Sequence, residues 1–367
     1  MTMSFDHVTL GQRVVFGAGR GAENLAAEVA RRGARRVMAI ASSRERELAA
    51  RVCGQVEVAV WFDDVVQHVP VATADAARAA AAEHGVDLLV SVGGGSTTGL
   101  AKAVALTTGI PVVAVPTTYA GSEATNVWGL TEDRTKTTGV DDRVLPAAVV
   151  YDAALTTSLP VGLSVASGLN ALAHCVDSLW APRADPINQA LALEGVRALA
   201  VALPGIVAEP EGLTGREQAL YGGYLAAVAF ASAGSGLHHK ICHVLGGTFD
   251  LPHAETHATV LPHVLAYNAP AVPALAGRLA AALGAPVGEG EDPVPAAVGA
   301  LNRLYEALGA PSRLADYGLT AGDIPEAVDR IVKAAPPSNP VPVTEAAITA
   351  LLTAALTGAA PTATLAH

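Results

Sequence analysis

The sequence predicts an α/β N-terminal domain with a Rossmann-like parallel sheet, followed by an all-α C-terminal domain. Three observations support this. Short β-branched runs alternate with alanine-rich helical stretches over the first part of the chain. Those runs are continuously apolar and bounded by glycine, as in strands buried on both faces of a parallel sheet. Beyond Asp152 the sequence changes to long Ala/Leu stretches at helical spacing. We therefore expect a dinucleotide-binding domain at 1–157 and a helical domain at 158–367.

The expected elements of the first domain follow one another in strand–helix order. Strands are expected at 14–16, 36–41, 56–62, 86–92 and 110–115. The clearest helices are 23–33, which ends at a glycine, and 74–85, which is rich in alanine. Ligands of open α/β sheets collect where the strands end, so the residues that follow these strands are the first candidates for a site.

Prolines divide the second half into expected helices. Pro160, Pro204, Pro252 and Pro262 are expected at helix boundaries. The Ala/Pro-rich 270s and the segment 336–343 are expected to be loops. Residues 219–237 carry no charge, but glycines and serines dilute their apolarity, so we expect a buried helix there and not a membrane span.

The composition excludes several classes of protein. The 367 residues carry 23 Lys+Arg against 34 Asp+Glu, a net charge of −11, and no basic stripe. A nucleic-acid or anionic-membrane surface is therefore not expected. With 51% hydrophobic and 16% charged residues, the chain is not globally disordered. Three widely spaced cysteines, Cys53, Cys175 and Cys242, suggest no disulfide framework, and the N-terminus resembles no secretory signal. We expect a cytoplasmic protein.

A glycine-rich turn follows the strand expected at 86–92. Gly93, Gly94, Gly95 and Ser96 lead into a helix, where glycines admit a phosphate and backbone N–H groups bind it. The expected ligand is a dinucleotide diphosphate; a simple tight turn is the alternative. Lys102 on the same helix would stabilise the phosphate or cap a surface.

Hydroxyl side chains follow the strand at 110–115, and a Ser/Thr-capped turn is again the alternative. Thr117, Thr118 and Ser122 are expected to contact the cofactor. After the strand at 36–41 no acid stands among residues 41–44, where an enzyme that prefers NAD often carries one. Ser42 is the candidate contact there, and NADH and NADPH both remain open.

Histidines are concentrated in the helical half. Among the eleven in the chain are His174, His238, His239, His243, His253, His257 and His263. Asn170 with His174, and His239 with His243, are i,i+4 pairs that share a helix face. His253 follows Pro252 at an expected loop. Such imidazoles bind metal or transfer protons near neutral pH, although a single buried histidine is more often a hydrogen-bonded core residue.

Five motifs together resemble the iron-containing (group III) alcohol dehydrogenase superfamily, with its dehydroquinate-synthase-like fold. They are GGGSTTGLAK (93–102), PTTYAGSEAT (116–125), LPAAVVYD (145–152), SGLNALAHCVDS (167–178) and the stretch 236–268 that begins GLHHKICHVLGG. The resemblance implies a nicotinamide cofactor, an active site in the cleft between the two domains, and a homodimer.

The resemblance also implies a divalent metal on an Asp and a His four residues apart and on two later histidines. The matching positions here are Asn170, His174, His239 and His253, with His243 as a further site histidine. Asn170 replaces the anionic ligand, and losing such a charge-assisted contact costs about 1.5–3 kcal/mol. We therefore expect no tightly bound metal.

With this asparagine the sequence looks most like the maleylacetate reductase branch of the superfamily, which reduces a carbon–carbon double bond of a small dicarboxylate with NADH or NADPH. Hydride addition to a conjugated ketone forms an enolate, which imidazole N–H donors can stabilise without a metal. His243 and His253 are the expected principal donors, and His174 and His239 complete the pocket. Asn170, Lys240 and His238 are expected to bind the substrate. Lys240 and His238 would receive a carboxylate, unless they lie on an exposed helix face.

Other interpretations stay open. A metal-dependent alcohol dehydrogenase acting on a small alcohol or aldehyde is the main alternative. A lyase of the dehydroquinate-synthase type would use NAD only transiently. A dinucleotide-binding sensor without catalysis would keep the glycine turn and not need the histidines. Cys175 and Cys242 are expected to be small buried side chains and not nucleophiles.

Overall fold

The computed structural model describes residues 3–132 and 135–361. It divides into two compact units. The sheet unit comprises Thr9–Leu159 and Glu211–Leu220, and the helical unit comprises Met1–Val8, Pro160–Pro210 and Tyr221–His367. The short segment before Thr9 therefore groups with the helical unit, although it precedes the sheet unit in the chain. Glu211–Leu220 groups with the sheet unit, although it lies in the helical half of the sequence. The functional division at residue 157 stays a prediction.

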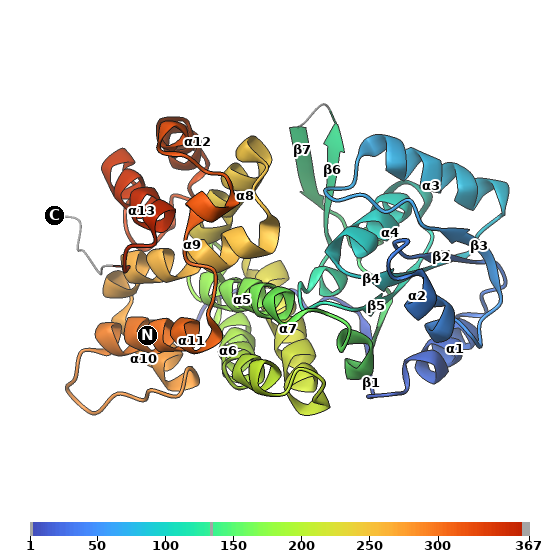
Figure 1. The fold of residues 1–367 in the computed structure, drawn as a ribbon, viewed down its shortest axis with the longest axis horizontal. Helices are drawn as coiled ribbons and strands as arrows, with labels where there is room; N and C mark the ends of the chain where they lie inside the picture. The colour runs from blue at the N-terminus through green and yellow to red at the C-terminus, as the bar shows by residue number, and fades with distance from the viewer. Residues whose placement is uncertain (1–2, 133–134, 362–367) are drawn as a thin grey trace. The chain divides into compact units, whose positions relative to one another are not determined.

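The sheet unit contains a six-stranded parallel sheet in the order β1-β8-β5-β4-β2-β3 (Figure 1). The strands are β1 Arg13–Phe16, β2 Val37–Ile40, β3 Val58–Phe62, β4 Leu88–Gly93, β5 Val112–Pro116 and β8 Ala148–Tyr151. The central strands β2, β4, β5 and β8 are buried along their whole length. The predicted fold class is confirmed, since a parallel sheet requires this burial on both faces.

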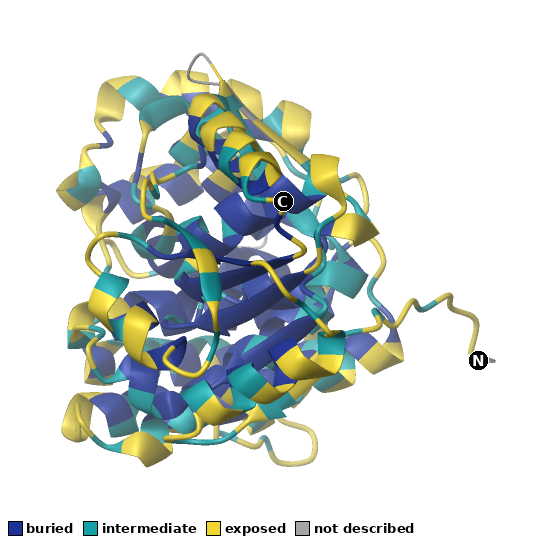
Figure 2. Cartoon of the chain, turned by 90° about the vertical axis from the view of Figure 1, so that its right-hand side faces the viewer, coloured by how far each residue is buried: buried dark blue, intermediate teal, exposed yellow. Residues whose placement is uncertain are grey.

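Helices cover both faces of the sheet. They are α1 Gly21–Arg32, α2 Arg46–Val52, α3 Val71–Glu83 and α4 Gly95–Thr108. Val37 and Ala39 of β2 pack with α1 and α2, while Met38 and Ile40 pack with α3 and α4, as the alternation of side chains along a strand dictates. In Figure 2 the central strands of the sheet are dark blue, and yellow marks the outward faces of the helices around them.

Three elements of this unit were not expected from the sequence. They are the short helix α2, the strand β8, and the antiparallel hairpin of β6 Val127–Glu132 and β7 Thr135–Val140. Strand β8 lies between β1 and β5, so the last strand of the unit fills an interior position. The chain returns after the β6–β7 hairpin to place β8 there, and the local sequence pattern does not predict such a return.

The helical unit is built around α5 Val161–Ser178, which is buried from Ser164 to Ser178. The other helices are α6 Pro186–Ala208, α7 Leu213–Ala233, α8 Leu237–Phe249, α9 His253–Asn268, α10 Pro273–Ala282, α11 Pro293–Leu308, α12 Ile324–Ala334 and α13 Glu345–Thr357 (Figure 1). Helix α7 begins in the part of the chain that groups with the sheet unit. Apolar side chains of α8, α9, α12 and α13 form one core cluster, which fixes the two histidine-bearing helices α8 and α9.

Several expected boundaries in the helical half were wrong. Pro204 lies inside α6 and Pro262 inside α9. The 270s form α10, whose first residue is a proline, while 336–343 contains no helix or strand, as expected. Proline costs a helix one hydrogen bond, and burial of the surrounding apolar side chains offsets this loss.

One described helix is long and apolar enough to cross a membrane. It is α6, and 44% of its most apolar window is buried. Helices α7 and α8 pass the same test only together, and they are bent by 99° at the break between them. The uncharged segment 219–237 thus contains a helix end and not one continuous helix. Core helices of large domains pass the same test, so these helices are weak evidence for a membrane span.

Candidate active site

Helix α5 presents three polar side chains on one face. Asn170, His174 and Asp177 are spaced i, i+4 and i+7, so they lie above one another along the helix. All three are buried, and Asp177 is 1% exposed. A buried carboxylate is stable only when hydrogen bonds compensate its lost hydration, so the partners of Asp177 are informative.

Asp177 accepts hydrogen bonds from the start of helix α8. The Gly236 N–H donates to Oδ2 at 2.8 Å, the His238 N–H to Oδ1 at 3.3 Å, and His239 Nδ1 lies 2.6 Å from Oδ2. A carboxylate is favoured at a helix N-terminus, where backbone N–H groups lack partners within the helix. A Cβ at Gly236 would collide with the Asp177 carboxylate, so only glycine permits this approach.

This contact determines how His239 presents its ring. With Asp177 ionised, His239 Nδ1 carries the proton and donates it, which leaves Nε2 as an acceptor. His239 Nε2 has no hydrogen-bond partner among the described residues, and neither does Asn170 Oδ1. Burial raises the pKa of Asp177 to about 7, although the N–H groups at the start of α8 favour the carboxylate.

The histidine rings lie together in one cluster. His174 stacks on His239 with ring centroids 4.9 Å apart, and Phe230 of α7 packs against both rings. The ring centroid of His257 of α9 lies 5.0 Å from that of His239, and the ring centroid of His253 lies 4.3 Å from that of His257. His243 is 6.0 Å from His239. The structure therefore brings together all four predicted catalytic histidines, His174, His239, His243 and His253.

The cluster has an exposed side and a buried side. His243 and His253 are exposed, whereas His174, His239 and His257 are buried. Burial lowers the pKa of His174 to about 4, and it lowers the pKa values of His239 and His257 well below 6.5. The buried imidazoles are therefore neutral at pH 7 and act as hydrogen-bonding groups, not as cations.

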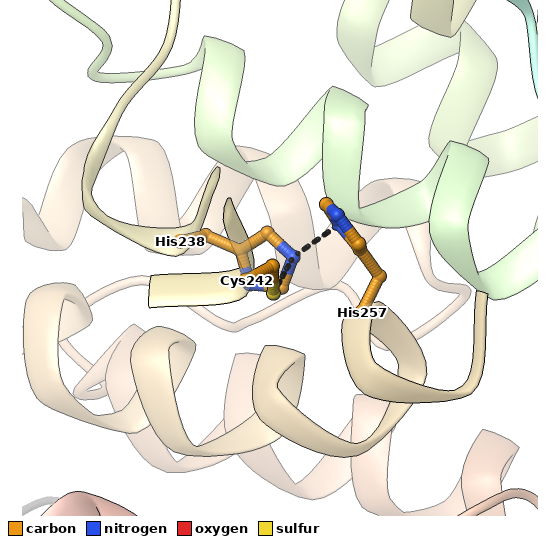
Figure 3. Close-up of side chains that lie close together, drawn as sticks. All are labelled: His238, Cys242 and His257. Carbon is orange, nitrogen blue, oxygen red and sulfur yellow. Dashed lines mark hydrogen bonds between the residues drawn. The ribbon is translucent and has the colours of Figure 1, made fainter. Parts of the chain in front are cut away.

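His238 does not have the environment expected of a carboxylate-binding cation. It is 1% exposed, and burial lowers its pKa to about 3. Its Nε2 lies 3.0 Å from His257 Nδ1 and 3.6 Å from Cys242 Sγ (Figure 3). His238 is therefore part of the interior, and this corrects the sequence interpretation. Lys240, two residues on, is half-buried.

Sequence reasoning missed three residues of this cluster, which are His257, Asp177 and Phe230. His257 is i+4 from His253 on α9 and Asp177 is i+3 from His174 on α5, so the helical spacing used for the other pairs could have found both. His253 was expected in a loop, but it is the first residue of α9. Phe230 has no signal in the sequence, because it stands in an apolar stretch of α7.

The predicted phosphate turn lies at the start of α4 in the sheet unit. Gly93 has φ +154°, and a side chain there would collide with Thr97 and lie 2.7 Å from Glu45 Oε2. Gly94 is the N-cap of α4 and no side chain caps it. Gly94 and Ser96 are half-buried and Gly95 is exposed. These features suit a helix N-terminus that binds an anion.

The first glycine turn of the chain is occupied by a side chain. Asp152 accepts hydrogen bonds from the N–H groups of Gly19 and Gly21, each at 2.7 Å, at the start of α1. A carboxylate of the protein itself therefore fills the position that a phosphate would need. The contrast with the uncapped α4 singles out Gly93–Ser96 as the candidate phosphate turn.

Glu45 supplies the acid that the sequence did not reveal near β2. Its Oε1 accepts a hydrogen bond from Thr117 Oγ1 at 2.6 Å, and its Oε2 accepts one from Ser42 Oγ at 3.0 Å. It directly precedes α2, one residue beyond the 41–44 segment in which an acid was sought. Ser42 and Thr117 thus contact a carboxylate beside the phosphate turn.

Lys102 does not lie at a surface. It is completely buried, and its Nζ donates to Thr125 O, Thr125 Oγ1 and Val127 O. Burial lowers its pKa to about 7, opposed by the charge of Glu123. Lys102 therefore supports the segment after β5 that carries Thr117, Thr118 and Ser122, and its three acceptors leave no N–H for a phosphate.

The four positions that match the metal site implied by the sequence resemblance lack its anionic ligand. Asn170, His174, His239 and His253 offer one amide and three imidazoles and no anionic ligand. Within the described ranges, donor atoms from three His, Cys, Asp or Glu residues lie within 4.8 Å of one another at one place, formed by His238, Cys242 and His257.

A parallel-sheet domain with an uncapped glycine turn and a helical domain with clustered histidines are the two parts expected of a dehydrogenase-class oxidoreductase. Two family models match the chain: "Iron-containing alcohol dehydrogenase" over residues 11–153 and "Fe-containing alcohol dehydrogenase family, C-terminal" over residues 164–356. The chain belongs to the iron-containing alcohol dehydrogenase family.

Individual relatives cover nearly the whole chain. The maleylacetate reductase of Sphingobium indicum is 47% identical over 98% of this chain and 99% of its own length. A crystal structure of an iron-containing alcohol dehydrogenase from Corynebacterium glutamicum is 58% identical, with TM-score 0.93, covering 97% of this chain and 98% of that one. The maleylacetate reductase structure from Agrobacterium tumefaciens is 40% identical, with TM-score 0.91, over 98% of this chain and 100% of that one.

Two glycines near the start and the end of α8 should respond in opposite ways to substitution by alanine, because Gly236 contacts Asp177 and Gly247 has open space around it. Gly236→Ala should destabilise the protein by about 1–3 kcal/mol, because the methyl group displaces the buried carboxylate from its donors. Gly247→Ala, at an exposed position of α8 with open space around it, should stabilise by about 0.5–1 kcal/mol. Thermal unfolding midpoints measure both, and an unchanged midpoint for Gly236→Ala would contradict the assigned contact.

Proposed function

We propose that this chain is a maleylacetate reductase, which reduces the carbon–carbon double bond of maleylacetate to give 3-oxoadipate with NADH or NADPH. The observation that carries the proposal is the cluster of neutral imidazoles at positions that lack an anionic metal ligand. Full-length relatives named maleylacetate reductase support the same substrate.

The reaction places one demand on the protein. When bound, the reduced nicotinamide supplies a hydride to the alkene carbon β to the ketone, and a proton then reaches the carbon α to it. Negative charge collects on the ketone oxygen between these events, so hydrogen-bond donors near that oxygen lower the barrier. The products are 3-oxoadipate and the oxidised nucleotide, with one proton consumed.

The exposed and buried histidines suit different roles in this reaction. His243 and His253, which are exposed, would donate to the enolate oxygen, and one of them would protonate the α carbon. His239, held by Asp177, would accept a hydrogen bond and so orient the proton-bearing group beside it. His174 and Asn170 would complete the polar wall. Lys240 remains the candidate cation for a substrate carboxylate.

The sheet unit would hold the cofactor at the start of α4. The N–H groups of Gly95 and Ser96 would bind its diphosphate, and Thr118 and Ser122 would contact it from the segment after β5. Glu45 would accept a ribose hydroxyl and repel a 2′-phosphate, so we propose a preference for NADH. The resemblance further suggests a cytoplasmic homodimer, and both points are part of this proposal.

The reductase and alcohol dehydrogenase alternatives differ in their need for metal. We expect enzyme treated with a strong chelator to oxidise NADH with freshly prepared maleylacetate at an undiminished rate, followed by absorbance. The main competitor is an alcohol dehydrogenase, the name carried by the structure from Corynebacterium glutamicum. Activity on a small alcohol or aldehyde that chelation abolishes and Fe²⁺ or Zn²⁺ restores would select that competitor.

Asp177→Asn should lower kcat by on the order of 10²-fold, because an amide N–H facing Nδ1 would force the His239 proton onto Nε2. The wild-type pH profile should lose activity as pH falls through about 7, where Asp177 takes up a proton, and the variant should lack this limb. The exposed Asp329→Asn is the matched control. A variant with lower stability but an unaltered pH profile would reduce Asp177 to a structural role.

Glu45→Gln should raise the ratio of kcat/KM for NADPH to that for NADH by about tenfold, since removing one charge near a phosphate is worth about 1–2 kcal/mol. Glu47→Gln, at an exposed position on α2, is the matched control. Steady-state kinetics with both cofactors measures the ratio. An equal ratio in the wild type and Glu45→Gln would show that Glu45 does not select the cofactor.

A further inference from the structure

Three buried donor atoms converge outside the four positions that match the family's metal site. They are His238 Nε2, Cys242 Sγ and His257 Nδ1, all within 4.8 Å of one another. His238 and Cys242 are i,i+4 on α8, and His257 faces them from α9 (Figure 3). All three side chains are 3% exposed or less.

The spacing of these atoms is close to that of a tetrahedral metal site. Zinc–nitrogen bonds of about 2.0–2.1 Å and a zinc–sulfur bond of about 2.3 Å place neighbouring ligand atoms about 3.3–3.6 Å apart. His238 Nε2 lies 3.6 Å from Cys242 Sγ and 3.0 Å from His257 Nδ1. The two imidazoles need to separate by only a few tenths of an ångström.

Both imidazoles can present an unprotonated nitrogen at this point. Their outer nitrogens, His238 Nδ1 and His257 Nε2, have no hydrogen-bond partner in the described part of the chain. In the metal-free protein one inner nitrogen donates a hydrogen bond to the other at 3.0 Å, so a cation binds only when that proton moves to an outer nitrogen, where no described group competes for the position. Two neutral imidazoles and a thiolate form the soft donor set that selects Zn²⁺ or Co²⁺ over Mg²⁺ or Ca²⁺.

Nearby charge compensates a buried dication. Cys242 supplies one negative charge when its thiol proton is released to solvent and the sulfur–metal bond forms. Burial and the charge of Asp177 raise the pKa of the Cys242 thiol in the metal-free protein, so the sulfur–metal bond must offset this cost. Asp177, which accepts the backbone N–H of His238, places a carboxylate close enough to attract a cation at this position.

We propose that His238, Cys242 and His257 form a binding site for a thiophilic divalent cation such as Zn²⁺, separate from the positions of Asn170, His174, His239 and His253. Resting on the proposed function, one consequence follows. His257 lies 4.3 Å from His253 and 5.0 Å from His239, so a cation that fixes its ring inhibits the reductase.

Cobalt is the probe, because a Co²⁺–thiolate bond has its own absorption. Metal-free full-length enzyme titrated with Co²⁺ should bind one ion per chain and show sulfur-to-cobalt charge transfer in the near ultraviolet. Cys242→Ser should abolish this band and weaken binding by more than about 100-fold. The matched control is Cys175→Ser, a buried cysteine beside His174 on α5, which should keep the band.

Each remaining outcome decides the proposal. His257→Gln should weaken Co²⁺ binding at least tenfold while keeping the band at higher Co²⁺ concentration, and it tests the site if Cys242→Ser fails to fold. Absence of binding, binding without charge transfer, or loss of the band in Asn170→Ala would overturn the proposal. The reductase activity of metal-free enzyme is assayed separately, so failure of the cation site is distinguishable from failure of the proposed function.

Discussion

The helical unit depends on one buried carboxylate. Asp177 of α5 accepts the N–H groups at the start of α8, and through His239 Nδ1 it also fixes one ring of the histidine cluster. The carboxylate that joins α5 to α8 therefore also determines which nitrogen of His239 carries the proton. Gly236 is part of this arrangement, since any larger residue would displace the carboxylate.

The two glycine turns show how one local pattern can serve two purposes. Both follow a strand and open a helix, so the sequence gives each the appearance of a phosphate turn. At the first, Asp152 reaches the N–H groups of Gly19 and Gly21 from the far end of the domain sequence. At the second, no side chain caps α4. Occupancy by a distant residue, and not the glycines themselves, separates a structural turn from a candidate ligand site.

Local pattern predicted the fold class and the four histidines that the structure brings into one cluster, because buried parallel strands and i,i+4 histidine pairs are visible in short stretches of sequence. It located the strand before Gly93 and the pair of His239 and His243. It failed where long-range contacts decide the outcome. Glu45 was missed, although it lies one residue beyond the segment searched, because its contact with Thr117 is made across the sheet. Lys102 looked like a surface or phosphate group, and its burial depends on the segment after β5.

The expectation that Pro262 ends a helix was wrong for a related reason. The hydrogen bond that proline costs the helix is outweighed by the burial of the apolar side chains of α9 around it.

The charge balance of the cluster explains why an asparagine at position 170 matters. The metal site that the sequence resemblance implies includes one Asp ligand, whereas Asn170 provides a neutral carbonyl oxygen. Asp177 is the anion that remains on this face of α5, but its oxygens already accept N–H groups from α8 and the ring of His239. The surrounding imidazoles are neutral because burial disfavours their protonation. In the proposed reaction, a site with this balance would bind the developing oxygen anion through directed hydrogen bonds and not through a full positive charge, which suits an enolate that must be protonated and released.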